Sequence, residues 1–155
     1  HCDKHVVKMI LETAQILCAV HHRLASEMDI HDRKTDIPYR KTHLNHPCVV
    51  WASESLGNYL WLIDLGRELA KEYTFRYSLE GKEPKTHKSV AVIEWAALHL
   101  PPLESKGLTP PAQAMPDHYK SKDDPVKAYR AYYCGDKGHL LTYKKRERPL
   151  WSISV

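Results

Sequence analysis

A histidine, a lysine and a glutamate follow one another at helical spacing near the start of the chain: His5, Lys8 and Glu12. Residues three and four positions apart lie on the same side of an α-helix, so an imidazole, an amine and a carboxylate would lie one turn apart. These groups accept and donate protons, and an amine beside a carboxylate can act as a nucleophile toward carbon. The spacing therefore predicts an acid–base site with these three residues as its candidate catalytic groups.

The helix that would carry these groups spans the first two dozen residues, because no Gly or Pro occurs from His1 to Leu24. Apolar side chains would cover most of its circumference, which predicts a central, mostly buried helix. The polar residues fall in one narrow stripe, made of His1, His5, Lys8, Glu12, Gln15 and His22. Unpaired polar groups are costly to bury, so the stripe either carries ordinary solvated charges or lines a polar site, and both interpretations stay open.

Basic and aromatic residues alternate in the last third of the chain. The candidate nucleic-acid contacts are Arg130, Tyr132, Lys144, Lys145, Arg146, Arg148 and Trp151. Cations neutralise phosphates and flat rings stack on bases, which makes this composition compatible with a nucleic-acid surface. The alternative is a helix whose tyrosines face the core, followed by a solvated basic segment.

Histidines supply a further pattern, since His1 and His5 are four positions apart and His43 and His46 are three apart. Zinc sites usually combine two tight ligand clusters, whereas the second pair here falls in a loop. We interpret these imidazoles as capping and packing groups and expect no metal and no cofactor. A metal-dependent enzyme that uses the four histidines stays open as an alternative.

Length and composition exclude several classes of protein. The chain has 155 residues and a formal net charge of +4, which fits one domain with an anionic partner. Its four cysteines have no CxxC spacing, which indicates free thiols in a reducing compartment. No apolar run is long enough to cross a membrane, and the GxGxxG, P-loop and GxSxG motifs are absent.

Caps and breakers place a short helix from Pro47 to near Gly57, with His46 or Asn45 as its cap. Asn58 would cap a longer helix that ends near Tyr77. Before these helices, the polar residues 26–42 predict a long loop.

Further along, residues 86–100 predict another helix, and the proline-rich residues 101–124 predict an extended connection that Ala112, Ala114 and Met115 hold to the core. Asp124 would cap a short helix from Pro125 to about Cys134, and the remaining segment is strand-like or irregular.

These elements predict a mainly α protein, a single compact helical domain over residues 1–155 with about five helices and long irregular connections. Because the chain opens with His1 in place of Met and its first helix is already under way there, we expect a short native N-terminal segment to precede it.

Six stretches resemble an uncharacterised family found in phages, giant viruses and environmental sequences: CDKHVVKMILETAQ, YRKTHLNHP, WASESLGNYLWL, EYTFRY, PPAQAMPDHY and AYRAYY with the closing RERPLW. The layout is more distantly similar to the small phage pyrimidine-dimer DNA glycosylases, which are single all-helical domains. In that family a terminal amine is the nucleophile, a glutamate assists, and basic residues hold DNA while a nucleotide is flipped out. The similarity implies Glu12 as the nearest acid on the stripe and Lys8 as an alternative amine.

We therefore predict a DNA-binding protein with a repair or base-processing role, glycosylase- or lyase-like, with double-stranded DNA as its partner. The alternatives are a non-enzymatic viral nucleic-acid-binding or assembly module and the metal-dependent enzyme. We expect a cytoplasmic location, in the host cell if the protein is viral, and no membrane partner. The oligomeric state is left open.

Overall fold

A computed structural model describes residues 1–27 and 36–153, which form α-helices joined by long irregular segments. The helices are α1 (Asp3–Glu27), α2 (Pro47–Ser53), α3 (Leu56–Tyr77), α4 (Val90–Leu98) and α5 (Pro125–Cys134). A short 3-10 turn, η2 (Asp117–Tyr119), lies between α4 and α5, and two more, η3 (Gly138–Leu140) and η4 (Leu150–Ser152), follow α5. The described residues contain no strand, so the predicted mainly α class with about five helices is confirmed.

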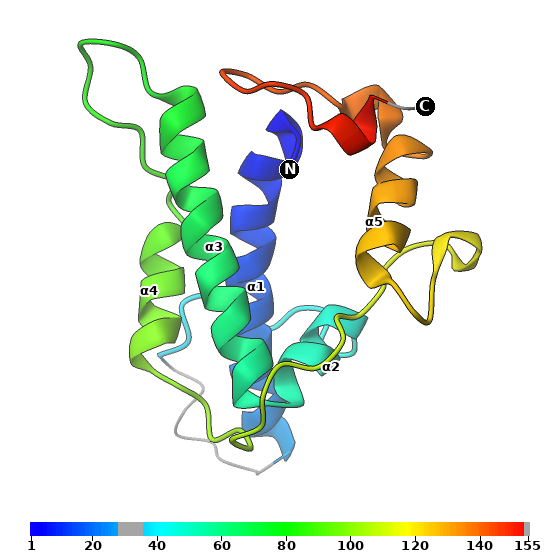
Figure 1. The fold of residues 1–155 in the computed structure, drawn as a ribbon. Helices are drawn as coiled ribbons and strands as arrows, with labels where there is room; N and C mark the ends of the chain where they lie inside the picture. The colour runs from blue at the N-terminus through cyan, green and yellow to red at the C-terminus, as the bar shows by residue number, and fades with distance from the viewer. Residues whose placement is uncertain (28–35, 154–155) are drawn as a thin grey trace.

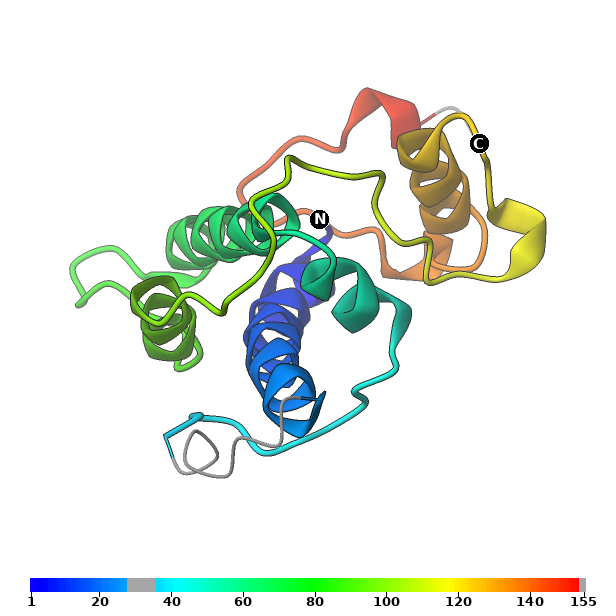
Figure 2. The same cartoon turned by 90° about the horizontal axis from the view of Figure 1, so that it is seen from below.

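Helix α1 is the central element, as predicted, and it packs against α2, α3 and α4 (Figure 1). Val6, Ile10, Ala14 and Leu17 recur at helical spacing on α1 and are fully buried. Removing such apolar area from water stabilises the fold by about 25 cal/mol per Å². Seen from below, α4 and α5 lie on opposite sides of α1 (Figure 2).

Helix α2 begins at Pro47, and the His46 side chain caps it by accepting a hydrogen bond from the Cys48 N–H at 3.2 Å. This cap was predicted, although α2 ends earlier than expected, at Ser53. Helix α5 is also confirmed, because Asp124 accepts from the Lys127 N–H at 2.9 Å and the helix stops before Gly135.

The predicted cap of α3 is wrong. Ser55 caps this helix by accepting from the Asn58 N–H at 3.1 Å, and Asn58 lies in the first turn. The Asn58 carboxamide is fully buried and donates to the Trp51 carbonyl and the Thr109 hydroxyl, both at 2.8 Å. Its oxygen accepts from the Thr109 N–H at 2.8 Å, so this side chain ties α3 to the long connection.

Helix α4 is shorter than predicted and begins at Val90. The preceding residues are held against the end of α3, where Thr74 donates to the Lys85 carbonyl at 2.8 Å and the Lys85 N–H donates to Ser78 at 2.9 Å. Those contacts keep the chain around Lys85 extended. The helical turn therefore starts only after His87, whose ring accepts from the Ser89 N–H at 3.2 Å.

Residues 101–124 form the expected irregular connection from α4 to α5 (Figure 1). Met115 is buried and Ala112 packs on the core as predicted, but Ala114 is exposed. Within the predicted loop 26–42, residues 28–35 lie outside the described part. After them, Tyr39 is held by a hydrogen bond from His22 Nε2 to its carbonyl at 2.8 Å.

All four cysteines are free thiols, as predicted: Cys2, Cys18, Cys48 and Cys134. Among residues 1–27 and 36–153, none of the helices combines the length and the apolar character that crossing a lipid bilayer requires.

Candidate functional site

The amine of Lys8 and the carboxylate of Glu12 lie 3.1 Å apart, one turn along α1. The two side chains are 66% and 37% exposed. An exposed pair of this kind stabilises a helix by only about 0.3–0.5 kcal/mol. The pair therefore contributes little to the stability of the fold, and both groups are accessible to a ligand.

A cavity of about 250 Å³ lies beside this pair, between α1 and the segment that leads into α2. Its lining consists of Glu12, Gln15, Ile16, Ala19, Thr42, His43, His46 and Val49. The polar stripe of α1 thus combines both predicted arrangements: it is solvated at Lys8 and lines a cavity at Glu12 and Gln15.

The two histidines of the cavity are held in defined orientations. His43 has a φ of +42°, in the left-handed region that few non-glycine residues adopt. Its Nδ1 lies 2.6 Å from the Thr42 hydroxyl. His46 Nδ1 accepts from the Cys48 N–H, so in the neutral ring the proton sits on Nε2, which becomes a donor.

His5 does not line this cavity, and its Nδ1 is hydrogen-bonded to the hydroxyl of Tyr133 on α5. Burial lowers the pKa of His5, and the positive charges of Lys8 and Lys137 lower it further. Burial also raises the pKa of Tyr133. Both partners are therefore neutral at neutral pH, and we assign the phenol as the donor.

Tyr133 is the site residue that the sequence analysis missed. The signal was present in the four-residue spacing of Tyr129 and Tyr133 on a short helix, but that spacing also fits a helix whose rings face the core. The three candidate catalytic residues do share one region, since Lys8 pairs with Glu12 and its charge acts on His5.

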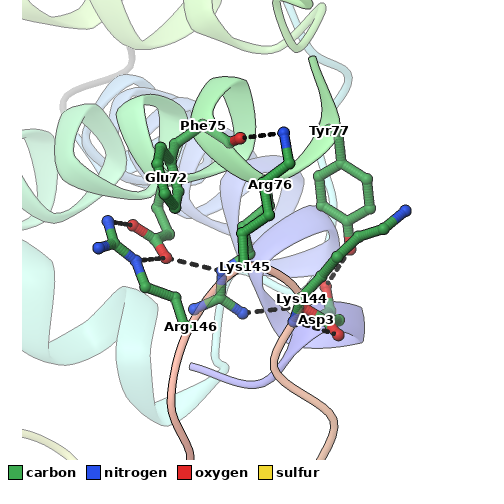
Figure 3. Close-up of polar contacts among 8 residues, drawn as sticks. All are labelled: Asp3, Glu72, Phe75, Arg76, Tyr77, Lys144, Lys145 and Arg146. Atoms are coloured by element: carbon green, nitrogen blue, oxygen red, sulfur yellow. Dashed lines mark hydrogen bonds and ion pairs between the residues drawn. The ribbon is translucent and has the colours of Figure 1, made fainter. Parts of the chain in front are cut away.

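Three consecutive basic residues of the C-terminal segment lie against the ends of α1 and α3 (Figure 3). The backbone N–H of Lys144 donates to the Asp3 carboxylate at 2.9 and 3.0 Å. Lys145 donates to the carbonyls of Phe75 and Ser78 at 3.1 and 2.8 Å, which satisfies the end of α3.

Arg146, the third of these residues, joins a charge network with Glu72, Arg76 and Asp3 (Figure 3). Arg76 is only 5% exposed and donates to Asp3 at 2.9 Å and to Glu72 at 2.6 Å. Hydrogen bonds from Arg146 and Arg76 lower the pKa of Glu72 to about 2. Burial opposes ionisation of Asp3, but hydrogen bonds from the Lys144 N–H and Arg76 outweigh it and lower the pKa of Asp3.

The other predicted nucleic-acid contacts gather around α5 and η4. The Arg130 guanidinium lies 5.6 Å from the centre of the Trp151 ring, and Lys137 Nζ lies 5.2 Å from that of Tyr132. Arg148 donates to the Ser152 hydroxyl at 3.2 Å and to its carbonyl at 2.6 Å. The seven residues therefore form two groups, and neither contributes to the lining of the Glu12 cavity.

The metal-dependent alternative required His1, His5, His43 and His46 to converge. Within the part of the chain that the structure describes, no group of three or more His, Cys, Asp or Glu side chains is placed to hold a metal ion. The histidine set therefore supplies no metal site there.

Comparison of the chain with protein-family models gives no match, and comparisons with curated proteins and with solved structures give none either. The resemblance to the viral family and to the phage glycosylases therefore stays a prediction.

Proposed function

We propose that this chain is a DNA-binding protein with a repair or base-processing role of the glycosylase or lyase kind. The observation that carries the proposal is the 3.1 Å approach of the Lys8 amine to the Glu12 carboxylate at the edge of a cavity. An amine beside a carboxylate is the arrangement that imine chemistry requires, because the amine attacks carbon while the carboxylate transfers protons.

In this proposal the neutral Lys8 amine attacks the aldehyde carbon of an abasic deoxyribose. A carbon–nitrogen bond forms, the carbonyl oxygen leaves as water after taking up protons through Glu12, and an imine results. His5 lies near enough to Lys8 for the positive charge of the lysine to lower the pKa of the imidazole. Because Nδ1 accepts from Tyr133, the neutral ring carries its proton on Nε2 and can donate a hydrogen bond to the substrate.

Contacts to DNA phosphates are assigned first to Arg130 and Lys144. The Arg130 guanidinium lies over Trp151, and Lys144 Nζ lies 5.7 Å from the centre of the Tyr77 ring. Lys145, Arg146 and Arg148 already donate to groups of their own chain. They contribute positive charge with fewer free donors, while Tyr132 and Trp151 supply rings for stacking.

The test is borohydride trapping on labelled duplexes that carry an abasic site or a pyrimidine dimer. The wild-type protein is expected to form a covalent adduct, and Lys8→Ala is expected to form none. Lys71→Ala is the matched control, because Lys71 is also an exposed lysine paired with a glutamate on a helix. An adduct of equal yield with Lys8→Ala would remove Lys8 as the nucleophile.

A second candidate function is non-enzymatic nucleic-acid binding or assembly. It is favoured by the pairing of Arg130 with Trp151 and of Lys137 with Tyr132, each of which places a cation beside an aromatic ring. Salt-dependent gel shifts without any trapped adduct would select this function over the lyase.

A further inference from the structure

We propose that the Glu12 cavity binds a planar heteroaromatic ring carrying an exocyclic amine next to a ring-nitrogen acceptor, the arrangement found in adenine and cytosine. This inference deepens the proposed function and rests on it for the choice of nucleobases among such rings. It concerns recognition by the cavity and does not require the Lys8 amine to react.

The polar edge of the site comes from Glu12 and Gln15, which lie one turn apart on α1 and both line the cavity. An ionised carboxylate only accepts hydrogen bonds, whereas a carboxamide both donates and accepts. An exocyclic amine can donate to Glu12 while the adjacent ring nitrogen accepts from Gln15. In the same pose, a ring with a carbonyl oxygen in place of the amine would set two acceptors against each other at Glu12, and its ring N–H would face the donor of Gln15.

The Gln15 carboxamide is available for such a contact. Within the described residues it takes part in no hydrogen bond, and the Glu12 carboxylate forms an ion pair with the exposed Lys8 amine. A partly exposed Gln that lines a cavity without a partner from its own chain has its full hydrogen-bonding capacity free for a ligand.

The faces of the ring would meet apolar side chains. Ile16, Ala19 and Val49 line the cavity, and Ala19 and Val49 are each 2% exposed because they also belong to the core. His43 also lines the cavity, and its Nδ1 lies 2.6 Å from the Thr42 hydroxyl. A mostly apolar cavity with a few fixed polar groups is the usual form of a small-molecule site.

The experiment is isothermal titration calorimetry of the whole wild-type chain with four nucleosides: adenosine, cytidine, inosine and uridine. The first two carry the amine, and the last two carry an oxygen in its place. We expect adenosine and cytidine to bind about tenfold or more tightly than inosine and uridine, which is within the discrimination that a two-point edge contact provides.

Two substitutions test the assigned edge, Glu12→Gln and Gln15→Met, which keep side-chain size and remove the carboxylate or the carboxamide. Each is expected to weaken adenosine binding about tenfold. Glu68→Gln is the matched control, since Glu68 is an exposed helical glutamate paired with Lys71 at 2.6 Å, and it should leave binding unchanged. If a variant fails to fold, the wild-type comparison of adenosine with inosine still decides.

Equal affinities for the four nucleosides, no heat from any of them, or full adenosine binding by both variants would overturn the inference. Repeating the titrations with single-stranded dA and dC oligonucleotides identifies the source of the ring. Tighter binding of the oligonucleotide that still depends on Glu12 indicates a base within a polynucleotide, and tighter binding of the nucleoside indicates a free small molecule. Both results retain the assigned edge.

The failure of this inference is distinguishable from failure of the proposed function. Amine discrimination without a trapped adduct would retain the cavity and remove the lyase chemistry. A Lys8-dependent adduct without amine discrimination would do the reverse.

Discussion

Arg146 and Glu72 meet in a two-pronged ion pair, in which Nε and Nη2 of the arginine donate to the two carboxylate oxygens at 2.9 and 2.8 Å. The same carboxylate accepts from Arg76, so one glutamate holds two arginines. Their burial differs greatly, because Arg76 is 5% exposed and Arg146 is 48% exposed. The buried arginine is therefore expected to contribute more to the stability of the fold than the exposed one.

Substituting the two arginines is expected to have unequal effects on stability. Arg76→Met leaves Asp3 and Glu72 without their buried partner and should lower the free energy of unfolding by about 3 kcal/mol or more. Arg146→Met removes a partly solvated partner and should cost less than about 1 kcal/mol. Urea unfolding followed by circular dichroism measures both values, and equal losses would contradict the burial argument.

Glu72 is expected to make the stability of the fold depend on acidity. Its pKa is lowered from 4.5 to about 2, so the unfolded chain binds this proton more tightly than the folded one. The stabilisation is complete above pH 4.5 and is lost as the pH falls from 4.5 toward 2. Unfolding free energies measured across that window should fall less steeply in Glu72→Gln than in the wild type. Identical slopes would show that this carboxyl group does not contribute.

The titration of His5 should respond to its charged neighbours with opposite signs. Its pKa lies below the usual 6.5 through burial first and the charges of Lys8 and Lys137 next, while Glu12 acts in the opposite direction. Lys8→Met and Lys137→Met should therefore raise the pKa of His5, and Glu12→Gln should lower it. The imidazole proton resonances in an NMR titration report this directly. An unchanged pKa of His5 in all three variants would show that these charges do not act on the imidazole.

The salt dependence of DNA binding distinguishes side chains that contact phosphates from cations that only stabilise the fold. If Arg130 and Lys144 each contact one phosphate, replacing either by Ala should reduce the slope of log K against log salt concentration by about 1. Lys71→Ala, which removes an exposed lysine of α3, should leave the slope unchanged. Fluorescence anisotropy with a labelled duplex at several salt concentrations gives the slopes. A loss of the same size for Lys71 would indicate unspecific attraction by net charge.

Two glycines provide a matched test of the packing between α3 and the long connection. A Cβ atom on Gly57 would lie 2.6 Å from the Gly107 carbonyl carbon and 2.8 Å from the Lys106 oxygen, whereas one on Gly107 would meet nothing within 4 Å. Gly57→Ala should therefore lower the unfolding free energy by about 1–3 kcal/mol, and Gly107→Ala should change it little. Thermal unfolding of the two variants tests this, and equal midpoints would contradict the close approach.

Local signals in the sequence were sufficient for much of the fold. The absence of breakers predicts α1, and the Asp124–Pro125 and His46–Pro47 pairs mark the starts of α5 and α2 because cap chemistry depends on neighbouring residues. The cap of α3 was not predictable in this way. Ser55 and Asn58 are both good caps by type, and the contact of Asn58 with Thr109, distant in sequence, decides between them.

In the candidate site, too, contacts between neighbours in sequence were predictable, whereas contacts between distant residues were not. The Lys8–Glu12 pair follows from helical spacing, whereas the contact of His5 with Tyr133 joins residues 128 positions apart. The basic C-terminal residues were recognised by type, but the Glu72 carboxylate that Arg146 contacts and the Phe75 carbonyl that Lys145 contacts come from α3. Composition contains no information about such pairings.

The charge network also fixes an order of events during synthesis. The Lys144 N–H contacts the Asp3 carboxylate across 141 positions of sequence, so a ribosome makes Asp3 well before Lys144. The apolar faces of α1 and α3 can associate early, but Asp3, Glu72 and Arg76 complete their contacts only when the C-terminal segment emerges. Closing so long a loop slows folding. Products truncated before Lys144 would expose this incomplete cluster, and cellular proteases would remove them in preference to full-length chains.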